Sequence, residues 1–587
     1  LFSYEPLPEE EAINGTVGLP RVLNMYENYP FWYRFFTDLG FRVVLSEEST
    51  RQTYERGMEH IPSETACYPA KISHGHIEDL VNKGVDMVFY PSVFYEEKEY
   101  EGAQNHLNCP VVAGYPDLIK NNAESLKRNN IRYINPFISF DNHRKLKSVL
   151  FDSLKLFYDV DKAGVFKAVD RAYEELYAYR KDIVNEGNRI IEDLERTGER
   201  AIVLAGRPYH IDPEINHGLP ELITSLGYAV LSEDALQGQF SDMDELRVLD
   251  QWVYHTRLYR AADYVSKSKN LEMIQLNSFG CGIDAVTTDQ VNEILASQGK
   301  IYTVIKIDEV STLGAARIRV RSLAQAVERG GRPAKKDTKL ESPIFTEEMA
   351  DDGYTILCPQ MLKDHFKILE PALKSEGINI DFLPDVDAET IEMGLKYVNN
   401  DACYPSITVV GQMMKAVMSG KYDNKRIALL MTQTGGACRA SNYVGFIRKA
   451  LKDAGWENIP VVAISAQGLE THPGFMKNFT MSALYKAFYS IVLGDLIMKL
   501  TNETRPYEIQ KGKTNDMRDY WIDKITKDFI RRPSFFVYRN LVKEMVRDFE
   551  SIPVTGEVKP KVGIVGEILV KYLPEANNFL QETIEAE

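Results

Sequence analysis

Four segments of the chain share one pattern of apolar and polar positions. Each begins with a run of β-branched and other apolar residues, passes through a corner containing glycine or proline, and continues with the apolar spacing of a helix. In the first three, the helix is followed by glycine and a second apolar run. The four segments are residues 15–46, 200–232, 353–384 and 560–587.

Strand–helix–strand units with crossovers of this length predict parallel sheets, because parallel strands need a connection long enough to hold a helix. We therefore expect an α/β fold of duplicated doubly wound parallel-sheet domains, flavodoxin-like (Rossmannoid) in type, with helical connectors. The expected parts are lobe A (1–147), a connector (148–199), lobe B (200–340), lobe C (341–478), a second connector (479–556) and the start of lobe D (557–587).

A repeated tetrapeptide indicates that the chain contains two related halves. Ala-Cys-Tyr-Pro occurs at 66–69 in lobe A and at 402–405 in lobe C, and an acidic residue, Glu64 or Asp401, lies just before it. The order of lobe A, helices and lobe B is repeated as lobe C, helices and lobe D. Lobe D stops after one strand and one helix, so we expect the natural polypeptide to continue beyond Glu587.

Composition and charge exclude several classes of protein. The chain of 587 residues is 44% hydrophobic and 26% charged, and its net charge of −16 argues against a nucleic-acid partner, which would need a basic face. No apolar run approaches the ~20 residues of a membrane-spanning helix, and no signal peptide opens the chain. We expect a cytoplasmic protein that binds neither nucleic acid nor membrane.

The six cysteines are too sparse for a disulfide scaffold and lie where a ligand site is expected. Ligands of open α/β sheets bind at the carboxyl ends of strands. Five cysteines follow predicted strand ends at corners shaped by glycine or proline, and the sixth, Cys109, precedes a proline. One such cysteine would be read as a buried apolar side chain, but five indicate metal ligation. The five are Cys67, Cys281, Cys358, Cys403 and Cys438.

The spacing of the cysteines favours an iron–sulfur cluster over zinc. Zinc sites favour local Cys-x-x-Cys pairs or paired His and Cys, and the sequence has neither spacing. Ligands gathered one at a time from separate domains suit a large iron–sulfur cluster in a cleft. Histidines near the corners are further candidates, although each taken singly fits a hydrogen-bonding or surface role. They are His74, His76, His106, His210 and His217.

The sequence does not single out a catalytic residue. The candidates are His74, His76, Glu64 and Asp401. The two acids are placed to relay protons or to cap a helix, and capping is the simpler role. The loop at 206–218 offers Arg207, backbone amides and a helix N-terminus to an anion, and the sequence contains no P-loop motif for ATP.

Taken together, the motifs resemble the activase-related, dehydratase-like region of the large fused 2-hydroxyacyl-CoA dehydratase activase proteins. That region is similar to 2-hydroxyacyl-CoA dehydratase subunits and to double-cubane cluster proteins. The resemblance covers nearly the whole chain. It is carried by GLPRVLNMYENYPFW, ACYPAKISHGHIEDL, NCPVV, LAGRPYHIDPEINHG, NSFGCGID, NNDACYPSITVVGQ and TQTGGACRASNY.

The resemblance implies a cofactor and a partner. The dehydratase subunits hold a [4Fe–4S] cluster on three cysteines, with one iron open to substrate, and the double-cubane proteins hold an [8Fe–9S] cluster on six. Both receive low-potential electrons from an ATP-hydrolysing activase with its own [4Fe–4S] cluster. The ATPase part is missing from this sequence, so the activase, a homodimer, is expected to be a separate chain or a missing segment that alone binds ATP.

The resemblance also suggests two ligand sets. One is Cys67, Cys109 and Cys281, and the other is Cys403, Cys438 and Cys358. Cys358 is the least secure ligand, because Leu19 occupies its place in lobe A and a counterpart of Cys281 is expected later in lobe D.

The leading expectation is an ATP-dependent iron–sulfur oxidoreductase that reduces a small molecule at a double-cubane cluster. One alternative is a 2-hydroxyacyl-CoA dehydratase-like lyase with a single [4Fe–4S] cluster. The other is a non-catalytic electron-storage or electron-transfer protein. A homo-oligomer is compatible with all three.

Overall fold

A computed structural model describes residues 1–310, 313–330, 333, 342–384, 386–465, 470–530 and 535–586. The chain divides into two compact units. Unit 1 comprises Leu1–Lys339 and Gly435–Arg439, and unit 2 comprises Leu340–Thr434 and Ala440–Glu587. The predicted boundary between lobes B and C, at residues 340 and 341, lies outside the described residues.

Lobes A, B and C each contain a four-stranded parallel sheet with the same topology. When the strands of each sheet are numbered along the chain, their order is 2-1-3-4, as in flavodoxin-like sheets. The expected α/β class with repeated parallel sheets is therefore confirmed. In sheet order, the strands are Arg42–Leu45 (β2), Thr16–Leu19 (β1), Met87–Phe89 (β3) and Arg132–Ile134 (β5) in lobe A; Ala229–Leu231 (β8), Ala201–Ala205 (β7), Leu271–Ser278 (β9) and Thr303–Ile307 (β10) in lobe B; and Ile380–Phe382 (β12), Thr355–Cys358 (β11), Ile427–Thr432 (β13) and Val461–Ile464 (β14) in lobe C.

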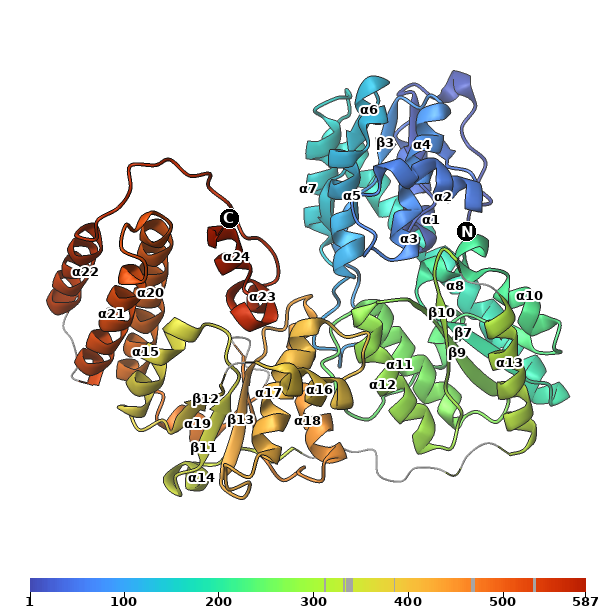
Figure 1. Cartoon of the computed structure of the whole chain (residues 1–587). Helices are drawn as coiled ribbons and strands as arrows, with labels where there is room; N and C mark the ends of the chain where they lie inside the picture. The colour runs from blue at the N-terminus through green and yellow to red at the C-terminus, as the bar shows by residue number, and fades with distance from the viewer. Residues whose placement is uncertain are drawn as a thin grey trace. The chain divides into compact units, whose positions relative to one another are not determined.

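Helices cover both faces of the sheets. In lobe B, α11 and α12 pack together on one face and α10 and α13 on the other, as Figure 1 shows. The central strand β9 is buried at every position, because it has helices above and below. The helices of the three lobes are Met25–Asp38 (α1), Arg51–Gly57 (α2), Tyr68–Lys71 (α3), Ser73–Asn82 (α4), Pro110–Asn122 (α5), Glu124–Arg128 (α6), Pro213–Asn216 (α9), Leu219–Thr224 (α10), Val253–Lys267 (α11), Gly282–Ser297 (α12), Leu313–Glu328 (α13), Glu347–Asp351 (α14), Lys363–Lys374 (α15), Ala388–Tyr397 (α16), Tyr404–Met418 (α17), Tyr443–Asp453 (α18) and Pro473–Lys477 (α19).

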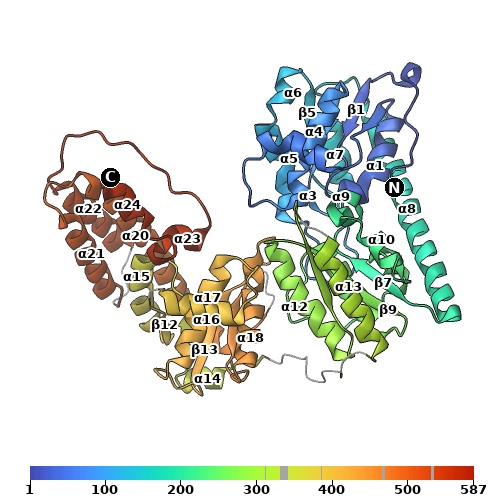
Figure 2. The same ribbon diagram turned by 45° about the vertical axis from the view of Figure 1, so that its right-hand side comes forward.

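One long helix links lobes A and B within unit 1. Helix α8, Lys162–Thr197, begins where the Asp161 carboxylate accepts hydrogen bonds from two backbone amides, and it ends at Gly198 in the left-handed conformation. It packs against α1 of lobe A and the short 3₁₀ helix Asp234–Gln239 (η4) of lobe B, and Figure 2 shows its length. With α7, His143–Leu154, it fills most of the segment expected to be a helical connector.

Polar contacts also join lobes A and B. Among them are four pairs in which each lobe supplies one partner and the acceptor is a carboxylate. Such contacts are more directional than apolar packing, so they fix how one lobe is oriented on the other. The pairs are Tyr26 with Asp212, Tyr68 with Glu214 (2.8 Å), Lys71 with Glu309 (2.6 Å) and Arg257 with Glu27 (3.1 Å).

In lobes A and C, an equivalent helix–helix contact lies beside each Ala-Cys-Tyr-Pro corner. A Cβ added to Gly75 of α4 would overlap the carbonyl oxygen of Thr53 in α2. In lobe C, a Cβ on Gly411 of α17 would overlap the carbonyl oxygen of Thr390 in α16. Each glycine lies eight residues after its Ala-Cys-Tyr-Pro cysteine. The close approach that only glycine permits therefore sets the course of the helix that follows each corner.

One apolar helix of unit 2 contradicts the expectation that no apolar run approaches the length of a membrane-spanning helix. The segment Met481–Tyr507, mostly helix α20 (Met481–Thr504), is long and apolar enough to cross a membrane by length and composition. About a third of its apolar stretch is buried inside the structure. That buried face packs with α15, Lys513–Ile530 (α21) and Phe535–Glu550 (α22), so the apolar run has a role in the core.

The strand expected at the start of lobe D is not formed. Residues 557–567 have no regular structure, and Val558 and Val565 are almost fully exposed. A lone strand has no neighbour to pair its backbone amides and carbonyls, which explains why the β-branched residues do not form one here. Beyond it, the described residues up to 586 include the short helices Ile568–Tyr572 (α23) and Leu580–Ala586 (α24).

The glycine contacts can be tested by adding a methyl group. We expect Gly75→Ala and Gly411→Ala each to lower the free energy of unfolding by about 1–3 kcal/mol or more, because a backbone carbonyl has little freedom to move away. Urea unfolding of the reduced, metal-free protein measures this. Gly114→Ala is the matched control: Gly114 is an exposed residue of α5 with nothing within 4 Å of an added Cβ, so this change should be neutral or slightly stabilising. Wild-type stability of both test variants would contradict the contact.

Candidate functional site

Four of the six cysteines are the N-cap residues of helices. Each has extended backbone angles, makes no side-chain capping hydrogen bond and is the residue at which the first helical turn begins. This end of a helix carries partial positive charge and favours a thiolate or an anionic ligand. The four pairs are Cys67 with α3, Cys109 with α5, Cys281 with α12 and Cys403 with α17.

The shared topology explains these positions. In lobes B and C a cysteine, Cys281 or Cys438, follows the third strand of the sheet and precedes the next helical turn. In lobe A the corresponding cysteine is Cys109, and the short strand Ser92–Tyr95 (β4) lies between the third strand and this residue. Lobes A and C add a second cysteine, Cys67 or Cys403, between their second and third strands. The first and third strands are neighbours in all three sheets, and this is the switch point at which such folds bind ligands.

Within unit 1, three thiols lie in one electrostatic neighbourhood. The buried phenol of Tyr209 interacts with Cys67, Cys109 and Cys281. Burial and then the nearby Cys109 raise the pKa of Cys67 to about 11. Burial and then Asp284 raise the pKa of Cys281 far above its ordinary range. Both thiols therefore hold their protons at neutral pH in the metal-free protein, and metal binding would release them.

A buried arginine contacts the Cys281 thiol. The Arg207 guanidinium donates from Nη1 and Nη2 to the two carboxylate oxygens of Asp284, at 3.0 and 2.6 Å, and from Nη2 to Cys281 Sγ at 3.4 Å. Nε2 of His255 lies 3.3 Å from Nη2. Burial lowers the pKa of His255 to about 4, so this imidazole is neutral at neutral pH. Burial opposes charge on Asp284, but Arg207 overcomes it and holds the pKa of that carboxyl well below its usual range.

A buried carboxyl group is linked to the backbone of Cys109 through the side chain of Asn108. Glu96 Oε1 accepts a hydrogen bond from Asn108 Nδ2 at 3.0 Å, and Asn108 Oδ1 accepts one from the backbone amide of Cys109 at 3.0 Å. Burial, only partly offset by hydrogen bonds, raises the pKa of Glu96 to about 7. The other donors to Oε1 are Asn24, Asn28 and Tyr254, each at 3.2 Å.

The cysteines of lobe C have different surroundings. Cys403 Sγ lies 2.9 Å from the Tyr443 hydroxyl. Cys358 is the last residue of β11, and its thiol packs among apolar side chains of the lobe C core. Burial raises its pKa to about 12. Unlike the four N-cap cysteines, Cys358 ends a strand and does not begin a helix. Cys438 is exposed and precedes the 3₁₀ helix Arg439–Asn442 (η5), in the short segment that groups with unit 1.

No preformed site for a single metal ion is found in the described ranges. Across them, no three Cys, His, Asp or Glu side chains are arranged to hold one ion. Each thiolate of an iron–sulfur cluster binds a different iron, so its ligands stand further apart than those of one ion. The donor set of unit 1, three thiols at helix N-termini beside a buried cation, fits such a group. Cys67, Cys109 and Cys281 would hold it.

The predicted histidines occupy structural positions. His76 lies between two serine hydroxyls, Ser46 at 2.8 Å and Ser49 at 3.0 Å. His74 packs edge-on against the ring of Tyr115, and neither of its nitrogens has a hydrogen-bond partner among the described residues. Burial lowers the pKa of His74 to about 4 and that of His76 to about 3, so both are neutral at neutral pH.

The other three predicted histidines each have a polar partner. His106 contacts Asp141 at 3.1 Å, and His217 lies 2.9 Å from the Asp308 carbonyl. His210 Nδ1 accepts the Arg207 backbone amide at 3.0 Å and so shapes the loop that presents Arg207.

The two acids before the corners do not cap the helices. The N-cap residues of helices α3 and α17 are cysteines without a side-chain capping bond, so neither Glu64 nor Asp401 is the N-cap residue. Glu64 is exposed and lies 3.6 Å from the Lys71 ammonium. The sequence reasoning missed Tyr209, Asp284 and Glu96. The only local signal was the position of Asp284, three residues after Cys281.

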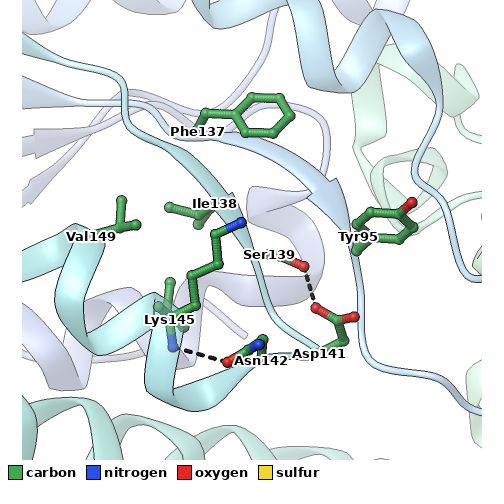
Figure 3. Close-up of a pocket in the computed structure, with 9 residues that line it drawn as sticks. Tyr95, Phe137, Ile138, Ser139, Asp141, Asn142, Lys145 and Val149 are labelled. Carbon is green, nitrogen blue, oxygen red and sulfur yellow. Dashed lines mark hydrogen bonds between the residues drawn. The ribbon is translucent and has the colours of Figure 1, made fainter.

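A cavity of about 200 Å³ lies elsewhere in lobe A, beside the short parallel pair Ser92–Tyr95 (β4) and Phe137–Ser139 (β6). Figure 3 shows Tyr95 and Phe137 on its walls and Lys145 extending across it. None of its lining residues is a cysteine. The cavity is therefore separate from the group of thiols.

A comparison with protein-family models identifies the first part of the chain. Residues 16–236 match the model described as CoA enzyme activase uncharacterised domain. This segment is a CoA enzyme activase-related domain. The resemblance to an activase-related region of the 2-hydroxyacyl-CoA dehydratase activase family is thus confirmed. No curated protein matches the chain significantly.

The activase-related domain includes part of the candidate site. It spans lobe A, helix α8 and the first half of lobe B, and it carries Cys67, Cys109, Arg207 and Tyr209. Cys281 lies beyond its end. The unit 1 site is therefore completed by residues outside the matched domain.

The pKa of Glu96 gives a test of its burial. The unfolded chain releases this proton near pH 4.5, whereas the folded protein keeps it to about pH 7. The resulting stabilisation is present below pH 4.5 and is lost as the pH rises through 7. Relative to Glu96→Gln, the wild-type free energy of unfolding should therefore fall between pH 4.5 and 8, by about 3 kcal/mol at most.

Chemical unfolding of metal-free protein across this pH range measures the difference. Glu221→Gln, which changes an exposed carboxylate of the same unit, is the control and should follow the wild-type profile. Parallel profiles for Glu96→Gln and wild type would show that Glu96 does not titrate as described.

Proposed function

We propose that this chain is an iron–sulfur component of an ATP-dependent reductase. Its activase-related domain supports an enzyme-associated role and a partnership with a dehydratase-type enzyme system. The observation that carries the proposal is the placement of cysteines at helix N-termini in repeated lobes, three of them around Tyr209 in unit 1.

The chain's own residues would act as binding and shielding groups. Cys67, Cys109 and Cys281 bind the cluster in unit 1, and Cys403 and Cys438, with Cys358 as the least secure member, bind its second part. When bound, a cluster of the [8Fe–9S] double-cubane type supplies low-potential electrons to a small molecule. The first-turn amides of α3, α5 and α12 offset the negative charge that the thiolates bring. Buried Tyr209 and Tyr115 limit the access of water to the thiols.

The electrons would come from a separate ATP-hydrolysing [4Fe–4S] activase, and ATP would bind only to that partner. The acidic chain, with a net charge of −16, would dock against a basic rim on the activase, so added salt should weaken the contact. We place the protein in the cytoplasm, where such thiols stay reduced.

A dehydratase-like lyase with one [4Fe–4S] cluster is the second candidate. It is favoured by a specific observation: three thiols of unit 1 interact with the one phenol of Tyr209, whereas Cys358 of unit 2 ends a strand and does not begin a helix. Three thiolates on a four-iron cluster leave one iron for substrate. The two candidates differ in iron content.

Iron content of protein purified without oxygen separates the candidates. About eight iron atoms per chain support the double cubane, and about four support the single-cluster lyase. Stoichiometric zinc with no iron would contradict both. A saturated, unreactive cluster shown by EPR to bind no small molecule would indicate an electron-storage protein.

Single cysteine variants test the ligands. Cys67→Ala and Cys403→Ala should each lose most of the iron and change the EPR spectrum, because each removes a thiol at a helix N-terminus. Cys358→Ala, the matched control from the core of lobe C, should keep most of its iron. If all three variants kept the full iron and sulfide content, the ligand assignment would be wrong.

A further inference from the structure

Two buried arginines of unit 1 have different surroundings. Arg257 is held by two carboxylates, Glu27 at 3.1 Å and Glu99 at 2.5 Å. Arg207 is equally buried but has one carboxylate partner, Asp284. Its remaining contacts are the neutral His255 and the sulfur of Cys281, at 3.3 and 3.4 Å. Glu99 accepts from Nε and Nη2 of Arg257, whereas a sulfur atom and a neutral imidazole stand beside Nη2 of Arg207.

The fold holds the guanidinium in this position from two sides. Arg207 follows strand β7 by two residues, and Cys281 and Asp284 lie at the start of α12, just after β9. β7 and β9 are paired neighbours, with Ala205 opposite Gln275, so the two loops leave the sheet side by side. The Asp284 carboxylate accepts from both terminal nitrogens of the guanidinium and fixes its plane. Nη2 is thereby directed at the sulfur.

Stability alone is a weak reason for this arrangement. A buried ion pair loses hydration that its mutual attraction repays only with good geometry, and apolar replacements of such pairs are often neutral or stabilising. A cation held against a sulfur atom has a clear physical effect if that sulfur is a cluster ligand. Both positive charge and hydrogen bonds to sulfur favour the state that carries the extra electron, and so raise the reduction potential.

We propose that Arg207 and Asp284 form a charge-setting pair for the metal centre bound by Cys281. Arg207 raises the reduction potential through its charge and its hydrogen bond to Cys281 Sγ. Asp284 opposes that charge and orients the guanidinium, so the potential reflects the balance of the two. Both are positioning residues that act through the ligand. This inference rests on the proposed function, because it requires Cys281 to bind a redox-active cluster.

The test compares variants whose effects have opposite signs. Arg207→Met removes the cation and leaves the Asp284 charge, so the midpoint potential should fall. Asp284→Asn leaves the cation uncompensated, so the potential should rise. Arg207→Met/Asp284→Asn removes both charges and should give a potential between those of the single variants. Redox titration followed by EPR measures the potentials after the iron content of each protein has been determined.

Two further variants serve as controls. Arg257→Met removes a buried arginine that contacts no cysteine, so it should destabilise unit 1 yet leave the potential unchanged. Arg207→Lys keeps the charge without the guanidinium fork and should recover part of the loss seen in Arg207→Met. If Arg207→Met and Asp284→Asn do not fold, Arg207→Lys and the double variant Arg207→Met/Asp284→Asn decide the result. Both lack the Nη2 hydrogen bond to Cys281, so both should have shifted sulfur-to-iron charge-transfer bands.

The outcomes separate this inference from the proposed function. Wild-type protein that binds no iron overturns the proposed function, and this inference with it. Iron-loaded variants with wild-type potentials and unshifted bands overturn this inference alone. Shifts of the same sign in Arg207→Met and Asp284→Asn also overturn it, because they would reflect general loosening of the site.

Discussion

All strands of a parallel sheet end at the same edge, and this constraint organises the whole candidate site. Because lobes A, B and C share the order 2-1-3-4, the loops after the first and third strands are adjacent in each lobe. Helices must begin at that edge, so their positive ends lie there too. A cysteine placed in any of these loops meets free amides and partial positive charge. The chain has cysteines in such loops in all three lobes.

Much of this arrangement could be predicted from local patterns. The apolar runs, the glycine and proline corners and the repeated Ala-Cys-Tyr-Pro predicted parallel sheets and the corner positions of Cys67 and Cys403. The strand predicted at the start of lobe D is not formed, because the apolar residues around Val562 have no neighbouring strand. Local sequence reports a preference for strand, whereas strand formation requires a partner.

The chemistry around the thiols could not be predicted, since it depends on contacts between distant segments. Arg207 reaches Cys281 across 74 positions of the chain, and the phenol of Tyr209 comes to lobe A thiols from a loop of lobe B. Burial of Glu96 likewise depends on helices α1 and α11. The N-cap positions of helices α3 and α17 are likewise taken by cysteines and not by Glu64 or Asp401.

The glycine contacts of α4 and α17 have a consequence for evolution. The course of each corner is set by a proline after the cysteine and by a glycine eight residues beyond it, while the cysteine side chain makes no capping bond. A mutation at the cysteine codon therefore leaves in place the proline and the glycine that set the corner. A duplicated scaffold of this kind can gain or lose cysteines one at a time, so descendants of one ancestor can come to carry different numbers of thiols at this edge.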